Sequence, residues 1–431
     1  PGDFSTVFGS RVWNFKERLI YHPLETLKLT ARAGYYFRER NKPGDTQDRY
    51  RDFNGGLKAN YIFNTLSNLE VGYTFDQYDK SDYQVLYKND VRDYSNVQHN
   101  VHALYNYTFN EKHTLTVGAD YLRDYLMSYQ FTDNANYIMH TADAFGQFDW
   151  NPTERLNVIA GLRFDYFSDS NVRHLSPHLG MMYKIGNCSL RGSYSQGFRS
   201  PTLKEMYMVF NMANMMMIYG NPDLKSETSH NFSLSAEYTK NRYNFSVTGY
   251  YNLVHNRINT VYSEDPKGQI YTNTDKVGIA GVDANISAKY PCGLGFRMSY
   301  TYIHEFMRDG QKKFTDTRPH TATVRVDWGE NLDKVDFNYS LNGRILSEVK
   351  TNVYNDSFNN PAAGSTAVTY PGYMIWDLTF SVGVFKGVNM NLAINNLFNY
   401  VPDYYYFNSP TTTGANLTLG LSLDIDRFFK K

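Results

Sequence analysis

The sequence has little of several features that mark common protein classes. It has two cysteines in 431 residues, which is too few for a disulfide framework or a zinc site. It has no run of about 20 consecutive apolar residues, so a helical membrane protein is excluded. It has no excess of charge, with 43 basic and 43 acidic residues, and no basic block of the kind that binds nucleic acid.

What the chain has in abundance is aromatic side chains: 38 Tyr, 28 Phe and 4 Trp. This abundance excludes a disordered chain. The mean hydropathy is nevertheless −0.54, because Asn, Thr, Ser and charged residues are interspersed with the aromatic ones. The combination is typical of a transmembrane β-barrel, whose strands face lipid on one side and water on the other.

Apolar and polar residues alternate, which places successive side chains on opposite faces of a strand. Runs of this kind occupy 115–121, 156–166, 243–251 and 417–425. They approach the length of about 9–11 residues that a tilted strand needs to cross a bilayer. Arg163 and Asp165 lie within the second run on its polar face, as a wet lumen permits. The pattern therefore favours a barrel over a soluble β-sandwich.

Connections between the runs alternate in length. The long ones are near 80–93, 197–227, 255–272, 347–371 and 397–414. Short turns such as Asn64–Ser67 and Asn151–Glu154 separate them. Outer-membrane barrels have short periplasmic turns and long extracellular loops, so the alternation also gives the orientation.

The whole pattern predicts an all-β, transmembrane antiparallel barrel with about nineteen strands. We place them near 8–21, 26–38, 50–63, 68–79, 94–108, 114–126, 136–150, 155–168, 174–183, 188–197, 228–240, 243–254, 273–290, 294–305, 319–328, 334–346, 372–385, 388–396 and 415–427.

The direction of the first strand carries information. It ends in the short turn His22–Glu25, so it runs toward the periplasm, and so does the last strand. Bacterial barrels have an even number of strands and normally begin upward. The sequence also starts Pro1–Gly2–Asp3, without a signal peptide. We therefore expect residues 1–431 to be the barrel domain of a larger protein, without its first strands.

The segment Ser193–Asn231 carries the most specific motifs. Thr202 and Glu205 have the spacing of a capping box, which predicts a short helix after Pro201. Asn221–Pro222–Asp223 predicts a turn. The first motif consists of Phe198, Arg199, Ser200 and Pro201 with Glu205, and the second of Tyr219, Gly220, Asn221, Pro222, Asp223 and Leu224 with Glu227.

On these two motifs the chain resembles the TonB-dependent receptors of the Gram-negative outer membrane. Gly278–Asp283, Thr317–Thr321 and Ile394–Tyr400 extend the resemblance, while Ser226 stands where the family usually has Pro. The resemblance implies a barrel of about 22 strands closed by an N-terminal plug domain. About three strands and the plug would then precede this sequence.

The resemblance also implies function and partners. We expect active import of a ligand bound by extracellular loops including 198–227, driven by the TonB complex through the plug. The expected partners are the missing N-terminal plug and strands, outer-membrane lipid and a surface lipoprotein that captures ligand. Neither enzymatic activity nor a covalently bound cofactor is expected.

Haem receptors of the family carry similar motifs around a His. Here the intervening segment holds no His but six Met, with Met212 near the expected position. Because a thioether can be an axial haem ligand, haem is one candidate substrate, with Met212 as its ligand. The candidate ligand-binding residues are Arg199, Tyr207, Met212, Met215, Met216, Met217 and Tyr219.

Several alternatives remain open. The substrate could instead be a siderophore or cobalamin. The Met side chains could simply pack the loop, and Arg199 could form an ion pair with Glu205 or Glu227. His230, His255, His304 and His320 lie near strand ends, where most histidines are solvated surface groups.

Other functional classes fit less well. A barrel hydrolase needs a paired Ser and His on one strand face, and no G-x-S-x-G motif is present. A porin would have about 16–18 strands. Cys188 and Cys292 both fall at short turns, four strands apart, which is roughly 19 Å at ~4.8 Å per strand. A disulfide needs Cα atoms within ~7 Å, so we expect each cysteine to be a free thiol or to pair elsewhere.

Overall fold

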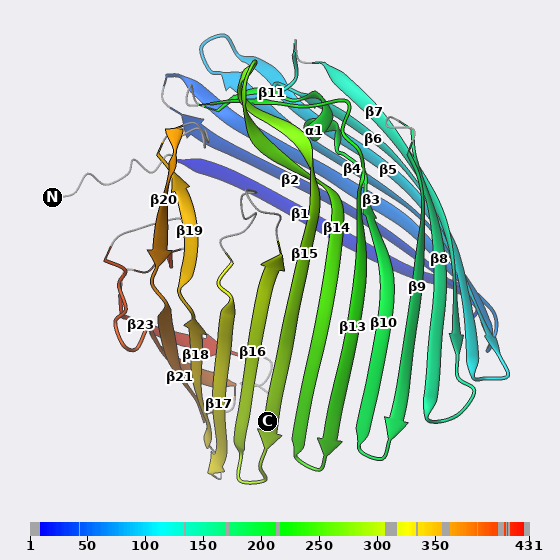
Figure 1. The fold of residues 1–431 in the computed structure, drawn as a ribbon, viewed down its shortest axis with the longest axis vertical. Coiled ribbons are helices and arrows are strands. Elements are labelled where there is room, and N and C mark those ends of the chain that lie inside the picture. The colour runs from blue at the N-terminus through cyan, green and yellow to red at the C-terminus, as the bar shows by residue number, and fades with distance from the viewer. Residues whose placement is uncertain are drawn as a thin grey trace.

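The structure is a computed structural model that describes residues 9–42, 44–132, 135–168, 172–212, 216–306, 317–332, 335–355, 363–385, 387–403, 409–410, 412 and 414–425. Nineteen strands of 8 to 23 residues form one curved antiparallel wall (Figure 1). Their bounds are β1 (Ser10–Leu24), β2 (Leu27–Lys42), β3 (Thr46–Asn64), β4 (Ser67–Gln84), β5 (Asn89–Phe109), β6 (His113–Ser128), β7 (Asn136–Trp150), β8 (Leu156–Phe167), β9 (Val172–Ile185), β10 (Cys188–Arg199), β13 (Glu227–Lys240), β14 (Tyr243–Glu264), β15 (Lys267–Lys289), β16 (Leu294–Phe306), β17 (His320–Leu332), β18 (Val335–Leu346), β21 (Tyr373–Phe385), β22 (Val388–Asn395) and β23 (Asn416–Leu423).

Each of these strands pairs with the next one along the chain, so the order in the wall is the order in the sequence. Four shorter strands lie in the connections. β11 (Val209–Met212) and β12 (Met216–Tyr219) form a hairpin joined to the wall through β15, which makes a 21-stranded sheet. β19 (Val349–Tyr354) and β20 (Ser365–Tyr370) form a separate hairpin. The prediction of nineteen barrel strands is confirmed.

Two predicted loops proved to be β-structure. Residues 255–272 continue β14 and β15 as a ribbon paired up to Glu264 and Lys267, and residues 80–93 extend β4 and β5. Above the membrane both faces of a ribbon meet water, so the apolar alternation that marks a strand is lost while the backbone hydrogen bonds continue. The strands are therefore longer than the bilayer requires.

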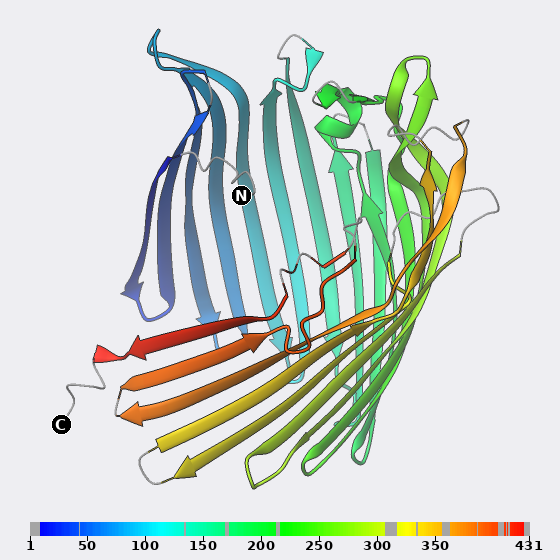
Figure 2. The ribbon, with the colours of Figure 1, turned by 90° about the vertical axis from the view of Figure 1, so that its left-hand side faces the viewer.

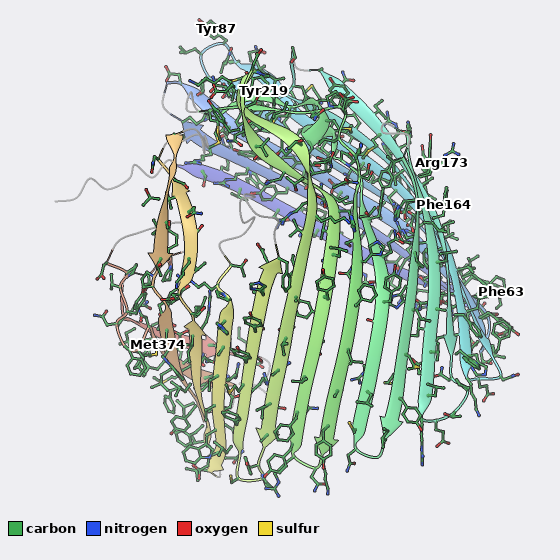
Figure 3. The ribbon with its side chains drawn as sticks, in the orientation of Figure 1. Phe63, Tyr87, Phe164, Arg173, Tyr219 and Met374 are labelled. Carbon is green, nitrogen blue, oxygen red and sulfur yellow. The ribbon has the colours of Figure 1, made fainter. Side chains whose placement is uncertain are left out.

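The two faces of the wall have opposite chemistry. The outer face carries exposed apolar side chains such as Leu234, whose exposed fraction is 70%, and Val247, at 49%. Figure 3 shows Phe63 and Phe164 on this surface at different heights. The inner face is polar and cross-linked: Arg163 pairs with Asp143 and Asp165, each at 2.9 Å. The molecule is apolar outside, as a wall bathed in lipid must be.

Two strands end the wall. Within the described residues β1 pairs with β2 alone and β23 with β22 alone. Figure 2 shows both edges on the same side of the molecule, β1 in dark blue and β23 in red, with their ribbons apart. Each edge leaves a row of backbone N–H and C=O groups without a strand partner, which lipid cannot satisfy.

Two smaller features complete the fold. Among the described residues, no helix has the length and apolar content to cross a bilayer, a finding that does not bear on crossing by strands. Cys188 and Cys292 are free thiols at the end with short turns, as expected from the sequence.

The two-faced wall generates a test on neighbouring positions of β14. Val247 faces outward, whereas Ser246 faces the lumen opposite Glu237. We expect Val247→Arg to lower the free energy of unfolding of the intact receptor in lipid vesicles by about 2–4 kcal/mol, since it places a charge in the apolar band. Ser246→Arg should lower the free energy of unfolding far less, because its guanidinium would contact water and the Glu237 carboxylate. Equal losses in a urea titration would contradict the assignment of faces.

Candidate functional site

The first motif folds into a short helix, α1 (Leu203–Tyr207). Thr202 is its N-cap: its hydroxyl accepts a hydrogen bond from the Glu205 amide, and the Glu205 carboxylate accepts one from the Thr202 amide. This reciprocal pair satisfies amides that have no partner within the helix. The capping box predicted from the sequence is confirmed.

An apolar cluster holds α1 inside the mouth of the wall. Leu203 and Met206 are buried against Leu126 of β6 and Phe131 just beyond it. Leu126 shares its strand face with Asp124, the face opposite that of the exposed apolar residues of β6. The helix therefore packs on the lumen side, and Figure 2 shows it at the end with long connections.

Arg199, the last residue of β10, joins the two motifs. Its guanidinium donates two hydrogen bonds to Glu205, at 3.0 and 2.9 Å, and one to Glu227, at 2.7 Å. Glu227 also accepts a hydrogen bond from the Ile258 amide of β14. The ion pair left open as an alternative for Arg199 is confirmed, with both carboxylates.

This tie lies above the membrane. Tyr194 of the same strand is on the outer face at the upper edge of the apolar band, and Arg199 is five residues further toward the extracellular end. The hydrogen bond to Glu227 raises the pKa of Arg199 above its ordinary value, although desolvation opposes it. Desolvation alone would raise the pKa of Glu227, but the hydrogen bonds from Arg199 and the Ile258 amide hold that pKa below its ordinary value. The stabilisation is therefore present at neutral pH and is lost as the pH falls through the lowered pKa of Glu227.

The second motif is tied to α1 and to β15. The backbone amide of Asn221 donates to the carbonyl of Glu205 at 2.9 Å, and its side-chain amide donates to the carbonyl of Tyr271 at 3.1 Å. The Asn221 side-chain oxygen accepts from the Asp223 amide at 2.9 Å, which makes the predicted turn. Leu224 is buried, whereas Pro222 and Asp223 are exposed.

Three further motif residues fill space tightly. Pro201 is fully buried. Phe198 stacks on His174 with their ring centroids 4.2 Å apart. A Cβ at Gly220 would lie 2.6 Å from the Met208 amide nitrogen, so no larger residue fits there without movement. The residues of both motifs thus build the loop and hold it in place.

The methionines divide into two groups. Met206 and Met208 are buried, as expected of loop packing. Met212 and Met216 face each other across the β11–β12 hairpin, and Met212 is 39% exposed. Met217, opposite Asn211 in the register, is half-buried, and Met215 lies outside the described residues.

The two candidate tyrosines pack against the wall. Tyr207 stacks on Tyr137 of β7, with centroids 3.9 Å apart and planes 3° from parallel. Tyr219 pairs with Ile270 of β15. Gly268, two residues earlier on β15, packs closely against Met217 and Tyr219 of the hairpin. The β11–β12 hairpin, which carries Met212, Met216 and Met217, therefore lies at the mouth between Tyr207 and Tyr219, both of which pack against the wall.

Sequence reasoning missed the residues that receive the loop. Leu126 and Phe131 lie over 70 positions before α1. Asn273 lies 48 positions after Lys225, whose backbone amide and carbonyl it binds, each at 2.7 Å. These positions carry no local signal, because their partners are set by the closing of the wall.

The Arg199 tie generates a second test. We expect Arg199→Met to speed hydrogen exchange at the Glu205 and Ile258 amides, since the loss of charged hydrogen bonds costs about 1.5–3 kcal/mol of local stability. Arg191→Met is the matched control, because Arg191 forms an exposed ion pair with Glu237 lower on the same strand. Unchanged exchange in Arg199→Met would show that the tie does not hold the loop.

Comparison with known proteins agrees with this architecture. Residues 3–397 match the family described as TonB dependent receptor-like, beta-barrel. The iron-regulated outer membrane virulence protein of Vibrio cholerae is 24% identical over 297 residues, covering 64% of this chain and 43% of that protein. Heme/hemopexin utilization protein C of Haemophilus influenzae is 21% identical, covering 65% and 44%.

Among solved structures, the siderophore receptor PirA from Acinetobacter baumannii superposes with a TM-score of 0.72 at 15% identity. The match covers 91% of this chain and 67% of that one, and it is a likeness of fold. The chain thus spans less than half the length of the two curated relatives. The nineteen-stranded wall, the tied loop and the family match together place the chain in the TonB-dependent receptor β-barrel family of the Gram-negative outer membrane.

Proposed function

We propose that this chain forms the wall and ligand-gathering loops of a receptor that imports haem or a haem-like iron chelate with energy from TonB. The observation that carries the proposal is the exposed Met212 with the half-buried Met216 opposite it, on a hairpin held at the barrel mouth. Relatives named for iron regulation and for haem and hemopexin use support the substrate class.

The hairpin suits a planar, partly apolar ligand. Residues directly opposite in an antiparallel pair have Cβ atoms roughly 5 Å apart on one face, so two thioethers meet there. Thioether sulfur is an axial haem ligand, and Met adapts its shape to apolar surfaces. Met212 is the proposed ligand, with Met215, Met216 and Met217 around it. The chain performs no covalent chemistry in this proposal.

The proposal also needs a complete barrel. The receptor's own N-terminal part would supply the strands that pair with β1 and β23 and the plug on which TonB pulls. The two unpaired edges support this, because the backbone groups of an open edge have no partner in lipid. A surface lipoprotein would deliver the ligand to the loops.

A siderophore is the second candidate. The likeness to siderophore receptors such as PirA is one of fold, and the inner wall carries ion pairs, such as Arg163 with Asp143, that a polar chelate could meet. Cobalamin would use the same mouth. The two classes differ in whether the methionines bind the metal of the ligand.

Absorption spectra of the intact receptor with haem test the substrate. We expect a shifted Soret band in the wild type, a changed band in Met212→Ala, and weaker binding in the triple variant Met215→Ala, Met216→Ala, Met217→Ala, since a lost axial ligand alters the haem electronic structure. Met181→Ala, on the outer face of β9, is the control and should match the wild type. Wild-type behaviour in both loop variants refutes thioether ligation, and no wild-type binding moves the proposal to a siderophore.

Barrel completion has its own test. We expect the 431-residue chain expressed alone to remain protease-sensitive and to show no heat-modifiable band on electrophoresis. Co-expression with the N-terminal part of the receptor should restore both properties, because its strands would cover the two edges. A stable, protease-resistant monomer of this chain alone would contradict the need for partner strands.

A further inference from the structure

Four tyrosine–histidine pairs lie on the outer surface with the same geometry. The phenol oxygen lies 2.7 to 3.0 Å from Nδ1 of a histidine on the next strand. Each tyrosine has a direct cross-strand partner on the strand that carries the histidine. The histidine lies two residues from that partner, toward the extracellular end. The pairs are Tyr73–His99, Tyr121–His140, Tyr194–His230 and Tyr300–His320.

The height of these pairs places them at the upper edge of the apolar band. On β5, His99 lies eight residues above Tyr107, which belongs to the aromatic residues at the short-turn end. That is close to the length of about 9–11 residues that crosses the bilayer. A phenol that donates to Nδ1 leaves the ring hydrogen on Nε2, where it can donate to a second group. The pairs thus present oriented imidazoles where lipid headgroups begin.

Two of the pairs enclose an arginine. Arg123 of β6 lies directly opposite His99 on one side and directly opposite His140 on the other, so the three side chains form one outward row on β5, β6 and β7. Direct neighbours in a sheet are roughly 5 Å apart. Arg123 has no ion pair with any residue that the structure describes. This row is a cationic group at headgroup height with its own charge uncompensated.

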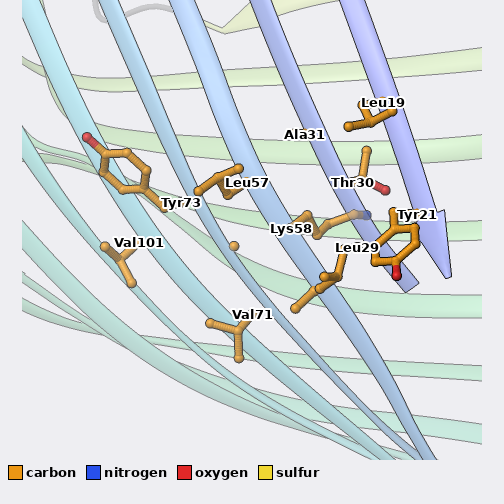
Figure 4. Close-up of a pocket in the computed structure, with 12 residues that line it drawn as sticks. Leu19, Tyr21, Leu29, Thr30, Ala31, Leu57, Lys58, Val71, Tyr73 and Val101 are labelled. Atoms are coloured by element: carbon orange, nitrogen blue, oxygen red, sulfur yellow. The ribbon is translucent and has the colours of Figure 1, made fainter. Parts of the chain in front are cut away.

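An apolar hollow adjoins this row at its β5 end, just below His99, and extends away from β6 and β7. It has a volume of about 490 Å³ and crosses the outer face of β1 to β5, lined by residues including Leu19, Leu29, Leu57, Val71, Tyr73 and Val101 (Figure 4). Val101 is two residues below His99, and Tyr73 is the residue that orients His99. Ala31 and Ala59 leave the space between the larger side chains.

We propose that the row His99–Arg123–His140 and the hollow that adjoins it at β5 bind one phosphate-bearing glycolipid of the outer leaflet. The guanidinium and the two imidazoles receive a headgroup phosphate, because Arg recognises phosphate through paired hydrogen bonds. An acyl chain occupies the hollow and covers its exposed leucine and valine side chains. This site lies on the outer face and is separate from the import of a ligand through the lumen.

The other two pairs provide an internal comparison. His230 lies opposite Gln196 and Leu253, and His320 lies opposite Tyr302, so neither has an arginine beside it. The same tyrosine–histidine geometry therefore occurs with and without a neighbouring guanidinium. If the row binds phosphate, removing its three side chains must have an effect that removing His230 and His320 does not.

The test uses native mass spectrometry of the intact, delipidated receptor titrated with diphosphoryl lipid A. We expect His99→Gln, Arg123→Gln and His140→Gln together to weaken binding by about tenfold or more, the effect of losing a charge-assisted contact. His230→Gln with His320→Gln should bind as the wild type does. Ala31→Phe with Ala59→Phe should also weaken binding, because it fills the hollow without removing charge. Heat-modifiable migration confirms that each variant is folded.

Two further arms identify the ligand. Fully dephosphorylated lipid A should bind the wild type as weakly as diphosphoryl lipid A binds the triple variant. Millimolar inorganic phosphate should not displace the lipid, because it lacks the acyl chains that fill the hollow. The proposal is overturned if the triple variant binds diphosphoryl lipid A like the wild type, if dephosphorylation has no effect, or if inorganic phosphate displaces the lipid.

Discussion

The need of every backbone amide and carbonyl in lipid to find a partner within the protein governs this molecule. A strand meets that need only with a neighbour on each side, so an unbroken succession of strand pairings runs from β1 to β23. Pairing between strands that are consecutive along the wall is the simplest way to build such a register. The same requirement makes the two edges the least stable part of the described wall.

Once the wall exists, its two faces can carry separate functions. The outer face must remain apolar over the thickness of the bilayer, and polar groups appear there at its boundary, as His99 and Arg123 do. The inner face is free to be charged, and it receives α1 and the loop motifs. A strand with period-two alternation can thus serve lipid and ligand with adjacent residues.

The sequence predicts the wall well because alternation is a local signal repeated nineteen times. It also predicts the capping box at Thr202, since helix starts depend on neighbours in the chain. It fails where both faces of a strand are wet, as in the ribbon above His255, and where the partner is distant. Leu126, Phe131 and Asn273 receive the loop only because the wall brings them to it. An ion pair of Arg199 with Glu205 or Glu227 was foreseeable from charge, but its simultaneous pairing with both carboxylates was not.

The Arg199 tie has a consequence for the ligand binding proposed above. Because Glu205, Glu227 and Asn221 already fix the loop to three strands, the loop ends have lost their conformational freedom before any ligand arrives. In the proposed binding, association would not have to order the whole connection, which lowers its entropic cost. Such a preorganised mouth favours capture at the first encounter over slow closure around the ligand.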